Sequence, residues 1–275
     1  MKNGAAVFLA VFIALGLSWC GFVLEPARQL GDAKQTTVLN SSDVYPLGRP
    51  GDANLGLRVY RANGCAACHT EQIRQTGVAC DVVLNSAGKN PAAVSNLVST
   101  LKLNGLAKEM AEAVSDKITA AGGKVEIHIV ATGEDIARAG WGMRQSVAED
   151  YLYDYPVQIG NLRVGPDLSN IGVRDPDLNW QLVHLYAPSS EAKGSTMPPF
   201  RYLFEIRKIS GTGASPVQTG ETPVPQPSPD ALVFPKGFGP PIGYEVVPKP
   251  EAKELGAYLL SLRANAPLYS APYTQ

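Results

Sequence analysis

A five-residue motif, Cys65-Ala66-Ala67-Cys68-His69, constrains this chain more than any other feature. Two thiols three positions apart lie on one side of a helical turn, and a histidine follows directly. A C-x-x-C-H run is the attachment pattern of a c-type haem, in which both thiols add to the porphyrin vinyl groups and the histidine ligates the iron. The motif therefore predicts one covalent haem c and a fold built around it.

Two other interpretations of the motif need more than it contains. A redox dithiol does not require the histidine and belongs in a βαβ context. A structural zinc site needs a further nitrogen or sulfur ligand, for which the chain offers Cys80, His128 or His184. The haem interpretation needs only the motif itself.

The N-terminal segment from Ala5 to Leu24 contains no charged residue. A bilayer core requires about 20 apolar residues in a helix. No small-residue cleavage site follows the segment, so we expect an uncleaved membrane anchor over residues 1–28. Lys2 favours a cytoplasmic N-terminus and places the rest of the chain outside the cytoplasm. The alternative is a lipoprotein signal lipidated at Cys20, for which the preceding Trp19 is bulky.

Composition excludes several classes of protein. With only four cysteines, the chain is not a disulfide scaffold. The formal net charge of -1 gives no basic stripe, so we expect no nucleic-acid partner. The 27 glycines and 22 prolines indicate extensive loops.

The residue pattern divides the chain into segments, and the predicted fold is mainly α. Residues 52–62 have Leu55, Val59 and Ala62 at helical spacing. Residues 80–132 are predicted to form a strand, two helices and a second strand, which make a small inserted α+β unit. The predicted haem domain comprises 41–79 and 133–208, with a short helix over 177–186. An irregular Pro/Gly-rich loop over 209–248 precedes a helix over 249–264. This helix is expected to complete the haem domain and presents Leu255, Tyr258, Leu259 and Leu262 on one side.

The second axial ligand has to come from elsewhere in the chain. The candidates are Met110, Met143, Met197, His128 and His184. Met197 is preferred, because small residues before it and two prolines after it in "GSTMPPF" make a stiff loop that can present a thioether. A Met/His pair raises the potential of a haem. His184 is the alternative.

Three stretches carry a family resemblance: "NGCAACHTEQIR", "YDYPVQIGNLRVGPDLSNIGVRDPDLNWQLVHLYAPSS" and "GSTMPPFRYLFE". They resemble the monohaem cytochrome c subunit, subunit II, of cbb3-type cytochrome c oxidase. The resemblance implies a class I cytochrome c-like haem domain. It also implies that Pro166 in "GPDL" offers its carbonyl to His69, and that Leu168 lies against the porphyrin. Arg163 would meet a haem propionate, or else be a solvated loop arginine.

The same resemblance implies a role in electron transfer. The donor would be a dihaem cytochrome c subunit or a soluble cytochrome c, and the acceptor the haem–copper catalytic subunit that reduces oxygen. One membrane helix and three histidines cannot build a haem–copper centre, so the chain itself would not be catalytic. It would cross the bacterial inner membrane once, in contact with lipid, with its haem domain on the periplasmic side. The alternatives are a free-standing anchored carrier or haem sensor, and an assembly or docking protein acting through residues 80–132.

Overall fold

The computed structural model describes residues 3–32, 34–49, 51–209 and 227–268. Helices account for 43% of the chain, which confirms the mainly α class. The chain divides into two compact units, and each is described by itself. One comprises Met1–Gly48 and Val147–Val157, and the other comprises Arg49–Ser146 and Gln158–Gln275.

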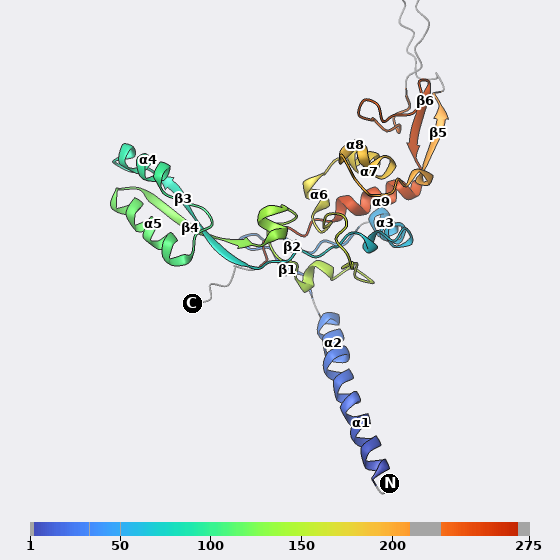
Figure 1. Cartoon of the computed structure of the whole chain (residues 1–275), viewed down its shortest axis with the longest axis horizontal. Coiled ribbons are helices and arrows are strands. Elements are labelled where there is room, and N and C mark those ends of the chain that lie inside the picture. The colour runs from blue at the N-terminus through green and yellow to red at the C-terminus, as the bar shows by residue number, and fades with distance from the viewer. Residues whose placement is uncertain (1–2, 33, 50, 210–226, 269–275) are drawn as a thin grey trace, which may run out of the picture. The chain divides into compact units, whose positions relative to one another are not determined.

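The first unit is dominated by an apolar helix at the N-terminus (Figure 1). Helix α1 (Gly4–Trp19) continues through a π-helical stretch, η1 (Cys20–Leu24), into α2 (Glu25–Gly31). The stretch Gly4–Gln29 is long and apolar enough to cross a membrane, and none of its most apolar part is buried. Because exposed apolar side chains such as Phe8 and Phe22 are stable in lipid rather than water, the helix fits the predicted single-pass anchor.

Beyond the apolar helix, this unit contains two short strands and a 3₁₀ turn. Strands β1 (Thr36–Thr37) and β2 (Val44–Tyr45) pair antiparallel. The Tyr45 hydroxyl donates at 2.7 Å to Oδ1 of Asp150, which lies within a 3₁₀ turn over Ala148–Tyr151. This bond joins two segments that are about a hundred positions apart in sequence.

The second unit is organised by two helices that cross at a glycine, α3 (Gly51–Ala62) and α9 (Pro250–Ser261) (Figure 1). A Cβ placed on Gly56 would lie 1.9 Å from the carbonyl oxygen of Glu254, so only glycine permits this approach. The rings of Tyr60 and Tyr258 meet beside the crossing, with centroids 5.1 Å apart. The two helices are therefore in close contact.

The buried face of α3 differs from the predicted one. Leu55 is exposed and Ala62 lies on the surface, whereas Ala53, Gly56 and Leu57 are buried. The helix presents small residues to its partner because backbones that approach closely leave no room for larger side chains. The expected face of α9 is correct, since Leu255, Tyr258, Leu259 and Leu262 are all buried.

Helix α7 (Leu178–Tyr186) completes this core, flanked by the single turns α6 (Ile171–Arg174) and α8 (Pro188–Glu191). Asp177 caps α7 by accepting from the backbone N–H groups of Asn179 and Trp180, as its position before the helix predicts. The core also contains buried side chains from segments that precede and follow α7 in the chain: Leu168, Ile171, Leu203, Phe204 and Leu232.

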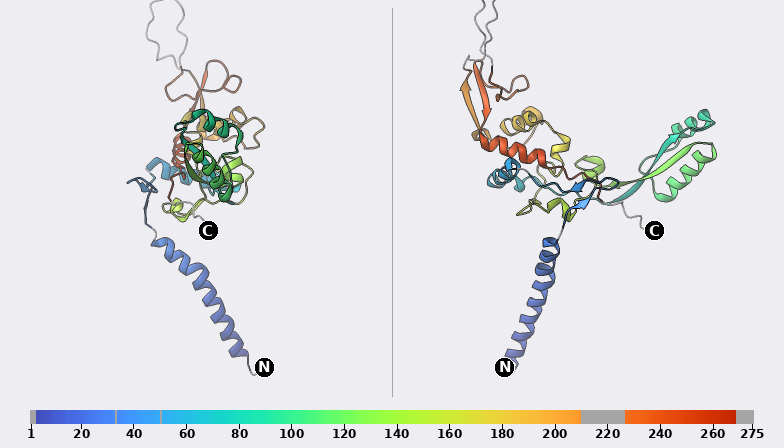
Figure 2. Two further views of the ribbon diagram at one scale, coloured as in Figure 1. Left: turned by 90° about the vertical axis from the view of Figure 1, so that its left-hand side faces the viewer. Right: turned by 180° about the vertical axis from the view of Figure 1, so that it is seen from behind.

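A separate small core lies within the inserted segment. Strand β3 (Gly77–Ser86) pairs antiparallel with β4 (Lys124–Thr132), and α4 (Pro91–Thr100) and α5 (Lys108–Ala120) connect them. Both views in Figure 2 show the two helices beside the hairpin. Asn90 caps α4, accepting from the Ala93 N–H group at 3.4 Å. Cys80 is 4% exposed and belongs to this core.

The Pro/Gly-rich segment is less irregular than predicted at its C-terminal end. Residues 244–248, expected in the loop over 209–248, form strand β6 (Tyr244–Pro248), which pairs with β5 (Phe204–Lys208). The Leu232 N–H group also donates to the Val246 carbonyl at 2.9 Å. Local sequence does not reveal the strand because its partner lies far upstream. Residues 210–226 of this loop lie outside the described residues.

Candidate functional site

The C-x-x-C-H motif begins where α3 ends. Gly64 adopts a left-handed conformation, with φ of 67°, that turns the chain into a single 3₁₀ turn, η2 (Cys65–Ala67). The N–H groups of Cys68 and His69 both donate to the Cys65 carbonyl, at 3.1 and 3.0 Å. The turn therefore holds the two thiols and the imidazole within five residues of chain.

Both thiols of the motif are free. Cys65 is partly buried against the core around α7, and Cys68 is exposed. Burial raises the pKa of Cys65 to about 12, so this side chain remains a protonated thiol at neutral pH. A thiol at an apolar edge is suited to adding across a vinyl group.

The His69 imidazole is oriented by the Pro166 carbonyl. Its Nδ1 lies 2.8 Å from that oxygen, which can only accept, so Nδ1 carries the hydrogen and Nε2 is left for a metal. The contact that the family resemblance implies is therefore present. Burial lowers the pKa of His69, which favours the neutral, ligating form of the ring.

Two glycines fit closely around His69. A Cβ on Gly165 would lie 2.3 Å from the imidazole Cε1. Gly160, with φ of +81°, would bring a Cβ within 2.2 Å of the His69 carbonyl oxygen. The loop before Pro166 thus packs against both the ring and the backbone of the histidine. The sequence interpretation did not include either glycine.

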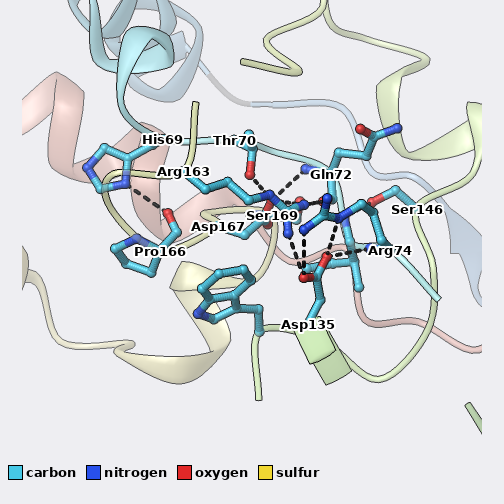
Figure 3. A network of polar contacts seen from close by, with 12 residues as sticks. His69, Thr70, Gln72, Arg74, Asp135, Ser146, Arg163, Pro166, Asp167 and Ser169 are labelled. Atoms are coloured by element: carbon cyan, nitrogen blue, oxygen red, sulfur yellow. Dashed lines mark hydrogen bonds and ion pairs between the residues drawn. The ribbon is translucent and has the colours of Figure 1, made fainter. Parts of the chain in front are cut away.

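A buried carboxylate, Asp167, connects the histidine segment to the proline segment (Figure 3). Its Oδ2 accepts from Thr70 Oγ1 at 2.6 Å and from the Gln72 N–H group at 2.7 Å. Its Oδ1 accepts from the Ser169 N–H group at 2.9 Å. The Asp167 side chain is fully buried, so these donors replace the water that it loses.

A second buried carboxylate, Asp135, lies at the opposite end of this network from His69 (Figure 3). It accepts from the Arg74 N–H group at 2.8 Å and from Arg163 Nη1 at 2.5 Å. Burial raises the pKa of Asp135, but hydrogen bonds from Arg163 and Arg74 outweigh this effect and lower the pKa to about 2. The group is therefore ionised throughout the physiological range.

Arg163 is not the solvated loop arginine that the sequence left as one possibility. Its side chain is 17% exposed and lies over the Trp141 ring, 5.2 Å from the centroid. Its guanidinium donates to Asp135 and to the Gln72 carbonyl. A contact between Arg163 and a haem propionate stays a prediction.

The predicted methionine ligand lies on the same core as the motif. Met197 is partly buried and packs on the apolar cluster that also contacts Cys65 and contains Leu168. By contrast, Met143 is 73% exposed, and Met110 is exposed on α5 of the inserted unit. His128 lies on β4, where it contacts Glu126 at the surface. Of the three methionine candidates, all of which the structure describes, only Met197 packs on the core that Cys65 contacts.

His184 has an unsatisfied polar atom. Its Nδ1 is buried without a hydrogen-bond partner among the described residues, and its ring stacks on Trp180 with centroids 5.1 Å apart. Burial and the nearby His69 lower the pKa of His184 to about 4, so the ring is neutral at pH 7. A buried, unpaired imidazole nitrogen costs free energy unless a further group accepts or binds it.

These features fit a haem. The two thiols are free. The hydrogen bond at His69 Nδ1 leaves Nε2 available to a metal, and the absence of a side chain at Gly165 makes room for the imidazole ring. The zinc alternative is less well supported, since no group of three or more His, Cys, Asp or Glu side chains gathers in the described part of the chain. Cys80 and His128 belong to the inserted unit instead.

Sequence reasoning missed the polar residues of this site: Thr70, Gln72, Arg74, Asp135, Asp167 and the two glycines. The acidic residue inside "GPDL" was an available signal for Asp167, because an aspartate flanked by proline and leucine in a packed loop must find donors. No comparable signal marks Asp135.

Comparison with protein families tests the resemblance. Residues 129–219 match the family model described as Cytochrome C oxidase, mono-heme subunit/FixO. The predicted resemblance is confirmed. The matched range contains Pro166, Leu168 and Met197, whereas the C-x-x-C-H motif precedes it. By its description, this family comprises oxidase subunits that carry one haem. The similarity of this chain to the family rests on the segment that contains Pro166. No curated protein matches the chain.

Proposed function

We propose that this chain is a membrane-anchored, mono-haem c-type cytochrome that serves as the electron-transfer subunit of a cbb3-type oxidase. In this proposal it passes electrons to the haem–copper subunit, which reduces oxygen, and is not itself catalytic. The similarity to the mono-haem subunit family and the N-terminal apolar helix support it. The haem domain lies on the periplasmic side of the bacterial inner membrane.

One observation carries the proposal: the 2.8 Å contact between His69 Nδ1 and the Pro166 carbonyl oxygen. The histidine belongs to the attachment motif, and the proline belongs to the segment that matches the oxidase family. The fold thus brings together two independent indications of haem binding that are 97 positions apart. A loop proline and a motif histidine without a common role would have no reason to be held in this geometry.

The proposed site divides its tasks among a few residues. Cys65 and Cys68 would hold the haem covalently, and His69 and Met197 would supply the nitrogen and sulfur ligands of its iron. The bound haem supplies a one-electron redox centre. Leu168 and the surrounding apolar core exclude water, which keeps the centre closed to reactions other than electron transfer. Pro166 fixes the imidazole.

Replacing Met197 by alanine tests the axial ligand. We expect the haem to remain attached, because both thiols are intact, but the potential to fall and the ferric spectrum to change, because the thioether is lost. Absorption spectra and redox titration of the purified protein provide the measurement. Met143→Ala removes an exposed methionine and serves as the matched control. A wild-type ferric spectrum in Met197→Ala would remove Met197 as ligand and favour His184.

Gentle purification from membranes tests the oxidase assignment. Mass spectrometry of what accompanies the protein is expected to identify a haem–copper catalytic subunit, with a dihaem cytochrome c as a further subunit. If haem c is present but no haem–copper subunit accompanies it, the chain is a free-standing anchored carrier or sensor. An oxidase that assembles and turns over normally without this haem would instead indicate a docking role for the inserted unit.

A further inference from the structure

Two short segments run alongside one another at the haem-binding histidine, residues 68–72 and 165–168. The Gly165 N–H group donates to the Cys68 carbonyl at 3.0 Å, and the Leu168 N–H group donates to the Thr70 carbonyl at 2.8 Å. The contact between His69 and Pro166 lies between these two backbone bonds. Its geometry therefore depends on how firmly the two segments are held together.

The Asp167 side chain is the strongest additional link between the segments. It follows Pro166 directly, and its Oδ2 binds the hydroxyl of the residue after His69 and the N–H group of Gln72. All three of its hydrogen-bonding partners are donors, and the side chain is fully buried. A buried carboxylate with this many donors holds its neighbours more rigidly than a neutral group can.

A second layer supports this link. Arg163 Nη2 lies 3.8 Å from Asp167 Oδ2, and its Nη1 lies 2.5 Å from Asp135 Oδ1. Asp135 also accepts from the Arg74 backbone, so it ties the far end of the histidine segment to the same arginine. Asp135 belongs to η3 (Glu134–Arg138), which directly follows β4. The exit of the inserted unit is thus joined to the haem-binding loop (Figure 3).

We propose that Asp167 is the positioning residue of the axial ligand His69, and that Asp135 supports it through Arg163. This inference rests on the proposed haem-binding function and deepens it. The hydrogen bond from Nδ1 to the Pro166 carbonyl makes the imidazole a more basic ligand, which favours the ferric state. Asp167 keeps that bond short and places a buried carboxylate near the iron ligand, and both effects lower the potential of the haem.

Asp167→Asn in the full-length holoprotein tests the proposal. The amide has a single acceptor oxygen, so it cannot accept from Thr70 and Gln72 at one position and from the Ser169 N–H group at the other, as the carboxylate does. The substitution also removes a buried carboxylate. We expect the haem to remain attached, while the ferric-to-ferrous equilibrium shifts toward ferrous by about tenfold, or 59 mV for one electron. The His69 Nδ1 proton should exchange with solvent faster in proton NMR spectra of the ferrous protein. Asp116→Asn, on the exposed surface of α5, is the matched control and should change neither.

A pair of substitutions at Thr70 tests the same link if Asp167→Asn does not fold. Thr70→Val keeps the shape but removes one donor to Asp167, so it should shift the potential in the same direction by less. Thr70→Ser retains the hydroxyl, so this variant should have the haem potential of the wild type.

The possible failures are distinguishable. If Asp167→Asn and Thr70→Val only reduce the yield or stability of the holoprotein, with unchanged potential and proton exchange, Asp167 is merely structural and the inference is wrong. If the unaltered chain carries no covalent haem on Cys65 and Cys68, the proposed function itself fails. The first result leaves the haem assignment intact.

Discussion

Replacement of both Cys65 and Cys68 by alanine is expected to abolish covalent haem attachment. The two thiols are free and sit on one turn at the edge of the core, and the thioether bonds have no other source in the motif. The measurement is haem-stained electrophoresis under denaturing conditions, with intact mass of the purified chain. The doubly substituted chain should lose the whole mass of the haem, and each single variant should attach it weakly or through one bond.

Cys80→Ala provides the control for this experiment. Cys80 likewise forms no disulfide, but it lies in the core of the inserted unit among Val82 and Val94. Its replacement should leave haem attachment unchanged and lower the stability of that unit only. Covalent haem on the doubly substituted protein, or its loss from the Cys80 variant, would contradict the assignment of the motif.

Gly56→Ala is expected to destabilise the haem domain strongly. Alanine raises helix propensity by about 1 kcal/mol relative to glycine. The new methyl group would lie 1.9 Å from the Glu254 carbonyl oxygen and 2.7 Å from the Tyr258 Cβ, so α3 and α9 must move apart. Overpacking of this kind costs about 3 kcal/mol. The clash therefore outweighs the propensity, and the free energy of unfolding should fall by about 2 kcal/mol.

Gly51→Ala is the matched control, because Gly51 is the first residue of the same helix and a Cβ there would meet no atom within 4 Å. It should leave the free energy of unfolding unchanged or raise it slightly. Chemical denaturation followed by circular dichroism compares the two variants with the wild type. Equal stability of Gly56→Ala and the wild type would show that the crossing of α3 and α9 is looser than the structure indicates.

The sequence predicted those parts of the fold that a local pattern encodes. The C-terminal helix, α7 and the strands and helices of the inserted unit carry their own periodicity, and α7 and α4 also have side-chain caps. Strand β6 was missed because its hydrogen-bonding partner is β5, and Phe204 pairs with Pro248. The face of α3 was misassigned because the close approach of α9 selects Gly56 rather than the larger Leu55.

The motif from Cys65 to His69 and the uncharged stretch from Ala5 to Leu24 could be recognised from the sequence alone, whereas the assignment of Met197 as a ligand stays a prediction. Each of the two recognised stretches is a run of neighbouring residues whose spacing already contains its chemistry. Only the tertiary structure could reveal the roles of Asp135, Asp167 and Gly165. Their partners lie tens of residues away, and a carboxylate in a loop carries no local mark of whether it will be solvated or buried. Burial and donor geometry arise when distant segments pack, and here that packing brings the Pro166 segment to His69.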